Sequence, residues 1–413
     1  MFDSHKIDDY FDGEKSLDGQ SDDNKLQTSY WYRIAKLGFP CVAAALLGLM
    51  IVMPNIRESV DLRDNITVPR KNEIDKLHIE STVFNMTDSK NRVNHLTADN
   101  IDETEPNSKK VKINNPHGLI PTDSGEVYIS AETGYFTQDV NILDLQNNVS
   151  ATVNDSTTVT SSKASYDFNT EMGYGDKPVF AQGEWGTLQA ESFKYDKKAN
   201  ILTLYGHSKY NGTHGELTAE EENKYFVSEE KIVSKGNVKI KQNGGTLFAD
   251  EVVSYLSSNK PKELIKAEAT GNVEIKTDKE TATGGKVVYD AENNKIMLYG
   301  ADNARVKVVQ GKNILTASKM IVYLVAGKKQ EISHVDALGQ VVVITPKGKA
   351  KGNRGTYSPQ KKLVELWDNV QIEQDGNFIN GEHAETDLTT SISKIKGTSK
   401  GGRVSGTFYK RKK

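Results

Sequence analysis

The stretch GNVKIKQNGGTLFADEVVSY, residues 236–255, contains the pattern that decides the fold. Its apolar residues Val238 and Ile240 alternate with lysines. Side chains two positions apart share one face of a β-strand, so this alternation predicts a strand. The turn residues QNGG follow, and they predict a tight turn into a second strand that ends near Tyr255.

The pattern recurs at a fixed interval along the chain. Tyr255, Tyr289, Tyr323 and Tyr357 are spaced 34 residues apart. A glycine and an alternating apolar segment precede each tyrosine: GNVKI from Gly236, GNVEI from Gly271, ARVKVV after Gly300 and GQVVVI from Gly339. A period of this length indicates stacked repeat units, and the inner period of two makes the units strands rather than helices.

A looser form of the repeat begins upstream, with GTLQAESFKYD from Gly186 and GELTAEEENKY from Gly215. The repeating region therefore runs from about residue 160 to about residue 390. No helical periodicity of convincing length interrupts the pattern after about residue 74. We predict an all-β, elongated chain of strands rather than several closed barrels.

Apolar residues that alternate along these strands are the candidates for an inner surface. If two sheets of such a stack do not close fully, these residues line an open groove; a filled core is the alternative, because buried apolar residues ordinarily only pack. The candidate groove residues are Val127, Ile129, Val238, Ile240, Leu247, Val273, Ile275, Ile296, Leu298, Val306, Val308, Val341 and Val343.

Residues 37–56, LGFPCVAAALLGLMIVMPNI, contain no charged side chain. A helix of this length spans about 30 Å, the thickness of the hydrocarbon core of a bilayer, so we predict one transmembrane helix. A buried core helix and a cleaved signal peptide are the alternatives, although the acidic segment of 36 residues that precedes it is unusual for a signal peptide. Basic residues flank the span on both sides, so charge does not decide its orientation.

The polar, acidic segment 1–36 lacks the apolar content needed to fold, and we expect it to be disordered. Beyond it the charges balance, which argues against a nucleic-acid partner. Residues 391–413 carry eight basic residues and no acidic one. This basic tail either protects a free edge strand by charge or contacts phosphates or an acidic partner.

Signatures of catalysis are missing from the sequence. There is no phosphate-binding loop, no G-x-S-x-G nucleophile motif and no spacing typical of a metal site, so we expect no enzymatic activity, no cofactor and no metal. Two other classes stay open: a surface-anchored, β-helical carbohydrate-active protein or adhesin, and a purely structural periplasmic tether.

Two parts of the chain resemble known families. The segments ELTAEEENKYFVSEEKIVSKGNVKIKQNGGTLFADEVVSY and IKAEATGNVEIKTDKETATGGKVVYDAENNKIMLYG resemble the lipopolysaccharide-transport protein LptA, or OstA-like domain. Upstream, VYISAETGYF, NILDLQNNVSAT and GTLQAESFKYDKKANILTLYGHSKY, together with the single anchor, resemble its membrane-anchored partner LptC. LptC proteins are usually shorter, so the chain resembles an LptC extended by an LptA-type domain.

The resemblance implies a twisted β-jellyroll with an open apolar groove that carries lipopolysaccharide. It implies a cytoplasmic tail (1–36), an inner-membrane helix (37–56), an LptC-like periplasmic jellyroll (57–210) and LptA/OstA-like repeats with a basic tail (211–413). The implied partners are lipopolysaccharide, the permease subunits of an inner-membrane ABC transporter at the 74–84 end, and a periplasmic or outer-membrane jellyroll protein at the 378–408 end. Their contacts would use strand edges.

Overall fold

The computed structural model describes residues 78–407, apart from gaps at 88–92, 106–107, 123–124, 154–155, 185, 213–214, 243, 259–263, 326–327, 388, 390–391 and 398–402. Within these residues the only helix is one 3-10 turn, η1 (Val227–Glu229). The all-β prediction is therefore confirmed. No described helix is long and apolar enough to cross a membrane, and the predicted span 37–56 lies outside the described residues.

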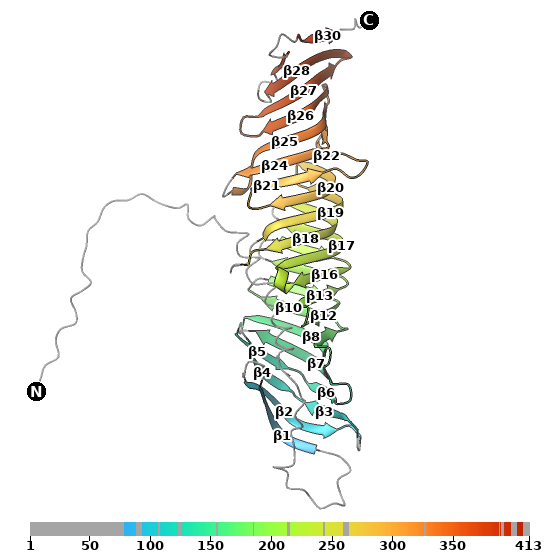
Figure 1. Cartoon of the computed structure of the whole chain (residues 1–413), viewed down its shortest axis with the longest axis vertical. Coiled ribbons are helices and arrows are strands. Elements are labelled where there is room, and N and C mark those ends of the chain that lie inside the picture. The colour runs from blue at the N-terminus through green and yellow to red at the C-terminus, as the bar shows by residue number, and fades with distance from the viewer. Residues whose placement is uncertain are drawn as a thin grey trace, which may run out of the picture.

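The strands form one elongated stack, with β1 at one end and β30 at the other (Figure 1). Strands that follow one another along the chain commonly pair antiparallel. The strands are β1 (His78–Thr87), β2 (Val93–Glu103), β3 (Lys110–Asn114), β4 (His117–Thr122), β5 (Gly125–Ser130), β6 (Thr133–Thr137), β7 (Ile142–Val153), β8 (Thr157–Asp167), β9 (Met172–Gly175), β10 (Val179–Gly183), β11 (Gly186–Ala190), β12 (Ser192–Asp196), β13 (Ile201–Tyr205), β14 (Ser208–Gly212), β15 (Gly215–Ala219), β16 (Glu222–Phe226), β17 (Lys231–Gln242), β18 (Gly245–Leu256), β19 (Leu264–Lys276), β20 (Glu280–Asp290), β21 (Lys295–Tyr299), β22 (Val306–Gln310), β23 (Asn313–Ala317), β24 (Lys319–Val325), β25 (Lys328–Thr345), β26 (Gly348–Ser358), β27 (Leu363–Gln374), β28 (Asn377–Asp387), β29 (Ile392–Lys396) and β30 (Ser405–Thr407).

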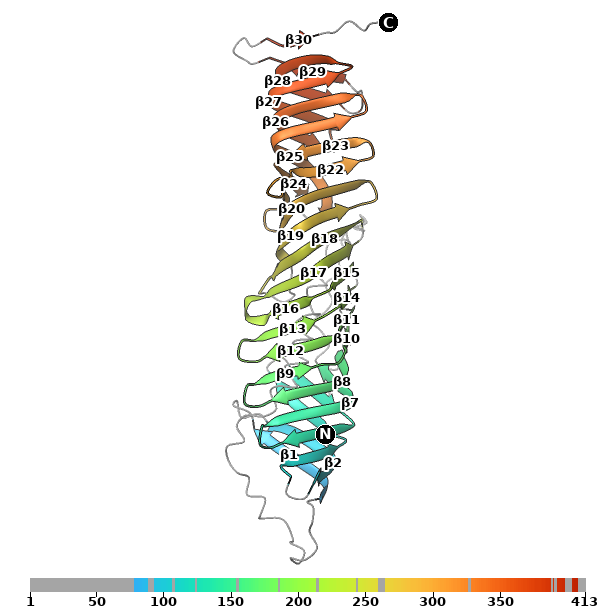
Figure 2. The ribbon, with the colours of Figure 1, turned by 90° about the vertical axis from the view of Figure 1, so that its right-hand side faces the viewer.

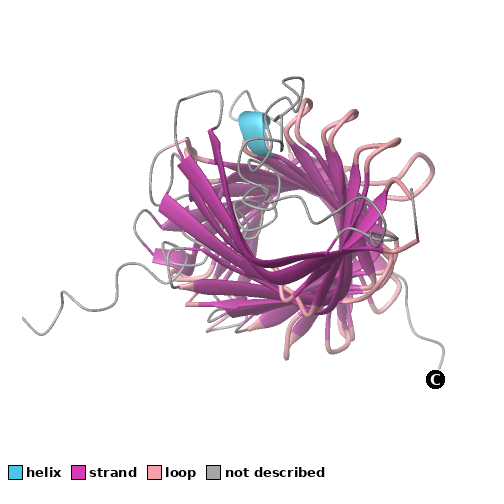
Figure 3. Cartoon of the chain, turned by 90° about the horizontal axis from the view of Figure 1, so that it is seen from below, coloured by secondary structure: helices cyan, strands magenta, loops and turns pink. Residues whose placement is uncertain are grey.

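The stack has two walls that meet along one corner. Long strands such as β19 pass through the corner and contribute their first half to one wall and their second half to the other. We call the wall that contains Tyr289 the tyrosine wall and the wall that contains Val273 the valine wall. Figure 2 shows the ladder from the side, and Figure 3 shows the strands curving around its long axis. Two such walls are consistent with a jellyroll.

The Gly-Asn pairs of the repeat form the corner. Gly271 and Asn272 lie inside β19 with φ of +72° and +46°, and the pairing register with β20 shifts at this point. Consecutive left-handed residues form a bulge that bends the strand, and glycine adopts this conformation without a steric penalty. Gly236–Asn237 bends β17 in the same way. Gly236, Gly271 and Gly339 therefore mark bends inside strands, whereas Gly300 lies between β21 and β22.

The four periodic tyrosines are not structurally equivalent. Tyr289 is aligned with Ile296, which packs against the buried core, so its row faces inward. Tyr255 faces outward, where the Lys266 ammonium lies 5.6 Å from the centre of its ring. The strand register explains this difference. Tyr255 pairs with Lys266, and Lys266 pairs with Asp290, so Asp290 rather than Tyr289 lies in the row of Tyr255. Tyrosines 34 residues apart therefore alternate between the two faces.

Candidate functional site

The row of inner residues next to the corner is sealed. Val238, Val273, Val306 and Val341 on the valine wall are all buried. Each faces a small residue on the next strand: Ala249, Gly284, Ala317 and Gly352. Alternation of large and small side chains lets adjacent strands interdigitate without voids. These four predicted groove residues therefore close the corner rather than line open space.

The next row of the valine wall is more open. It contains the predicted residues Ile240, Leu247, Ile275, Val308 and Val343, which the strand register aligns. All are half-buried, and the first four pack against the same core cluster. This row also points inward, and it lies two residues along each strand from the sealed row at the corner. We call it the middle row.

The tyrosine wall contributes the opposite side. Leu298 is buried beside the corner, whereas Ile296, two residues away on the same face, is half-buried. The register aligns Ile296 with Tyr289 on one side and Val322 on the other. The inner faces of both walls thus form an apolar trough that is sealed at the corner and open away from it.

The two predicted residues of the first half, Val127 and Ile129, both lie on β5. Val127 is fully buried, and Ile129 is half-buried and packs against the buried cluster. The register places Ile129 opposite Ala151, at the start of the same middle row. Val127 therefore belongs to the sealed interior, and Ile129 lies at the half-buried start of the middle row.

Open space is present between the walls toward the β28 end. A cavity of about 520 Å³ is lined by apolar side chains of both walls, among them Val343, Ala350 and Ile372 on one side and Val364 and Leu366 on the other. Polar side chains stand at its rim, including Asn313, Thr345, Lys349 and Gln374. This arrangement suits a ligand with an apolar body and a polar end.

The outer faces carry the ion pairs. Glu268 accepts hydrogen bonds from the ammonium groups of Lys266 and Lys286 at 2.5 and 2.7 Å. These bonds hold the pKa of the Glu268 carboxyl below its ordinary value. On the valine wall, Glu274 pairs with Lys276 at 2.8 Å. Polar outer faces and apolar inner faces make both walls amphipathic.

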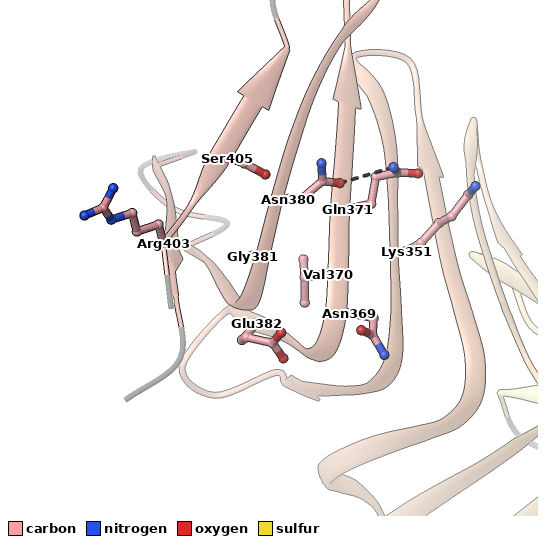
Figure 4. A pocket seen from close by; sticks show the side chains of 9 residues that line it. All are labelled: Lys351, Asn369, Val370, Gln371, Asn380, Gly381, Glu382, Arg403 and Ser405. Atoms are coloured by element: carbon pink, nitrogen blue, oxygen red, sulfur yellow. Dashed lines mark hydrogen bonds between the residues drawn. The ribbon is translucent and has the colours of Figure 1, made fainter. Parts of the chain in front are cut away.

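A second, polar pocket lies on the outside of the valine wall near β30 (Figure 4). Its volume is about 450 Å³. Gln371 is aligned with Lys351 on one side and with Asn380 on the other, and the Gln371 amide donates to Asn380 Oδ1 at 3.2 Å. Arg403 and Glu382 complete a lining that is unsuited to acyl chains. Among the described residues, no group of His, Cys, Asp and Glu could hold a metal.

The sequence prediction missed the small residues opposite the valines and the interior aromatics of the first half. Tyr166, Phe193, Tyr195 and Tyr225 are buried in one cluster. The patterns FKY at 193–195 and Leu-x-Ala before it were visible in the sequence. Period-two alternation in these patterns could have assigned the aromatics to the inner face.

Two family models match the chain. Residues 41–214 match the family described as lipopolysaccharide-assembly, LptC-related. Residues 218–307 and 303–392 each match the family described as LptA/(LptD N-terminal domain) LPS transport protein. Comparison with curated proteins gives no match.

Among solved structures, one similar chain is LptH from Pseudomonas aeruginosa, described as the LptA homologous periplasmic component of the conserved lipopolysaccharide transport device. It is 18% identical, with a TM-score of 0.27, over 32% of this chain and 95% of that chain.

The stacked strands, the sealed corner and the amphipathic walls define a jellyroll-type β protein with an apolar interior. The LptC-related match precedes the LptA-type matches along the chain, which is the order of the two resemblances in the sequence. The chain therefore contains an LptC-related segment followed by LptA-type segments. The predicted resemblance is thereby confirmed.

Proposed function

We propose that this protein is a non-enzymatic carrier in the lipopolysaccharide bridge, and that the acyl chains of the lipid travel along the trough between the walls. The observation that carries the proposal is the half-buried middle row, which presents a continuous apolar surface behind a charged outer face. The family matches support the same role, because both families are described by lipopolysaccharide assembly or transport.

The physical need for such a surface is large. Each methylene group exposed to water costs about 0.8 kcal/mol, so a lipid with several acyl chains does not cross an aqueous compartment unaided. A trough shields the chains along its length and leaves the charged headgroup in water. Energy for directional movement comes from a partner, because the sequence has no phosphate-binding loop.

The arrangement of partners follows from the same proposal. Residues 37–56 anchor the chain in the inner membrane, residues 1–36 are cytoplasmic, and residues 57–413 lie in the periplasm. The permease subunits of an ABC transporter deliver lipid to the LptC-like part, residues 57–210. The repeats of residues 211–413 pass it toward the outer membrane. Within the described residues β1 pairs only with β2, and β29 and β30 pair only with β28, so both ends of the stack are suited to strand addition by neighbouring jellyroll proteins.

Site-specific photo-crosslinking in cells tests the proposal. A photoreactive residue in place of Ile240 or Ile275 faces the trough, whereas one in place of the neighbouring Lys239 or Glu274 faces outward and is the matched control. We expect lipopolysaccharide adducts at both inner positions and none at the outer ones. No adduct at either inner position, or equal adducts on both faces, would contradict the carrier function and favour a structural tether.

A further inference from the structure

The lysines of the trough differ in their partners from one level of the stack to another. Those of β20 and β21 are paired: Lys286 Nζ lies 2.7 Å from the Glu268 carboxylate, and Lys295 Nζ lies 3.5 Å from that of Asp290. Five lysines farther along the chain form no ion pair with any described residue: Lys312, Lys347, Lys349, Lys361 and Lys362. Positive charge is therefore neutralised at β20 and β21 and remains available toward the β28 end.

Four of these lysines lie at the level of one strand. β26 begins at the rim of the valine wall and, beyond the corner, ends at the rim of the tyrosine wall. Lys347 directly precedes β26 and Lys349 is its second residue, whereas the other pair lies in the hairpin that follows β26. Two carboxylates lie on the valine-wall rim, Glu373, which is aligned with Lys349, and Asp375 in the next hairpin. Both rims at this level together therefore carry an excess of positive charge.

The apolar cavity of about 520 Å³ lies between these rims. Lys347 and Lys349 are among its lining residues, and Ile372 lines it from the inner face of the same wall. Val364, two residues after Lys362, lines it from the tyrosine wall. Cationic side chains therefore stand beside apolar space at one level of the trough.

The inner row of the tyrosine wall becomes polar at the far end of this cavity. The register extends the row from Ile296 through Val322 to Val364, and then to Thr386 and Ser393. The Thr386 and Ser393 hydroxyls are hydrogen-bonded to each other at 3.0 Å. Within the described residues, Val364 is therefore the last aliphatic side chain of this row. Acyl chains that move beyond β27 lose apolar contact with it.

We propose that this cavity is a holding site for one lipid molecule, whose acyl chains occupy the apolar space while an acidic group of its headgroup contacts the rim lysines. This inference rests on the proposed function and states where along the trough the lipid is bound most tightly. Ammonium groups bind phosphate and carboxylate through charge-assisted hydrogen bonds. Lysines without a carboxylate partner form such bonds without first breaking an ion pair. The lipid pauses at this level before it leaves the chain at the β30 end.

Photo-crosslinking titrations of the purified full chain test the holding site. A photoreactive residue replaces either Ile372, in the cavity, or Ile275, in the middle row of β19. Lipopolysaccharide is added in detergent over a range of concentrations, and the adducts are quantified at each concentration. The half-saturating concentration is the quantity compared, because it does not depend on the crosslinking yield of a position.

Two matched variants change the rims. The neutral variant carries Lys347→Gln, Lys349→Gln, Lys361→Gln and Lys362→Gln, and the cationic variant replaces the same four lysines by arginine. Arginine keeps the positive charge, so the pair separates the effect of charge from that of substitution.

We expect adducts at Ile372 to reach half-saturation at a lipid concentration at least about fivefold lower than adducts at Ile275. The neutral variant should abolish this difference, and the cationic variant should keep it. Equal half-saturating concentrations in the chain with native lysines overturn the holding site and leave the carrier function standing. An unchanged difference in the neutral variant, or an equal loss in both variants, does the same. No adduct at either position contradicts the carrier function itself.

Lipopolysaccharide from which the phosphates have been removed identifies the acidic group that the lysines contact. Loss of the difference between Ile372 and Ile275 with this lipid assigns the contact to a phosphate. Retention of the difference assigns it to a carboxylate.

Discussion

Replacing Gly271 by alanine tests the corner that keeps the trough sealed on one side. The residue has φ +72°, a region that costs an L-residue about 1–2 kcal/mol. A Cβ would lie 2.2 Å from Oδ2 and 2.8 Å from Cβ of Asp250. Asp250 would then lose the hydrogen bond that its Oδ2 accepts from Asn272 Nδ2 at 3.0 Å, worth about 1 kcal/mol. We expect a total loss of about 3 kcal/mol.

Hydrogen–deuterium exchange measures this loss where it occurs. Each unit of a stacked repeat protein contacts only its neighbours, so the stability that changes is that of local opening. A loss of about 3 kcal/mol accelerates exchange of the protected amides in β18, β19 and β20 by roughly 100-fold. Amides in distant strands such as β8 should be unaffected.

Gly311→Ala is the matched control. Gly311 also has a left-handed φ, +58°, but no heavy atom lies within 4 Å of the position that its Cβ would take. Only the conformational cost applies there, so exchange near Gly311 should rise by roughly tenfold. Combining Gly271→Ala with Asp250→Gly, which removes the carboxylate and the Cβ of residue 250, should reduce the Gly271 penalty to the Gly311 level. Equal effects of the two single glycine variants would refute the close approach at the corner.

Two further predictions concern single polar groups. Because its two lysine partners lower the pKa of Glu268, the stabilisation is present above the unfolded-state pKa of about 4.3 and is lost as pH falls through the lower folded-state pKa. Glu268→Gln should therefore flatten the decline of the urea midpoint below about pH 4.5; an unchanged decline would contradict it. Tyr225→Phe removes a hydrogen bond to the Glu230 carboxylate, and we expect a loss of about 2 kcal/mol in local exchange, against about 1 kcal/mol for Tyr195→Phe, whose acceptor is a neutral amide. Equal losses would show that the charge of the acceptor contributes nothing.

Much of the fold was predictable because its cause is local. Alternation in NVKIK and NVEIK follows directly from the two-residue period of a strand. The position of each Gly-Asn pair was visible as well, although its place inside a strand was not. The sequence alone did not reveal that β17 and β19 pass through the corner, because a turn and a mid-strand bulge use the same residues.

The sequence predicted which face of the strands carries the candidate site. It did not distinguish the sealed positions on that face from the half-buried ones. Val273 and Ile275 have the same alternation and the same face, and the sequence treats them alike. In the folded chain Val273 is sealed against Gly284, whereas Ile275 is half-buried. Their difference is their distance from a corner that forms only when two walls meet.

The sequence by itself determined that the chain is a series of strands with one apolar and one polar face, because that property depends only on neighbouring residues. The tertiary structure decided which face each periodic tyrosine occupies, since a 34-residue interval shifts the register by one position. It also decided which inner positions are buried and which are half-buried. That difference depends on contacts between side chains such as Tyr195 and Leu188, which come from different walls and meet only in the folded stack.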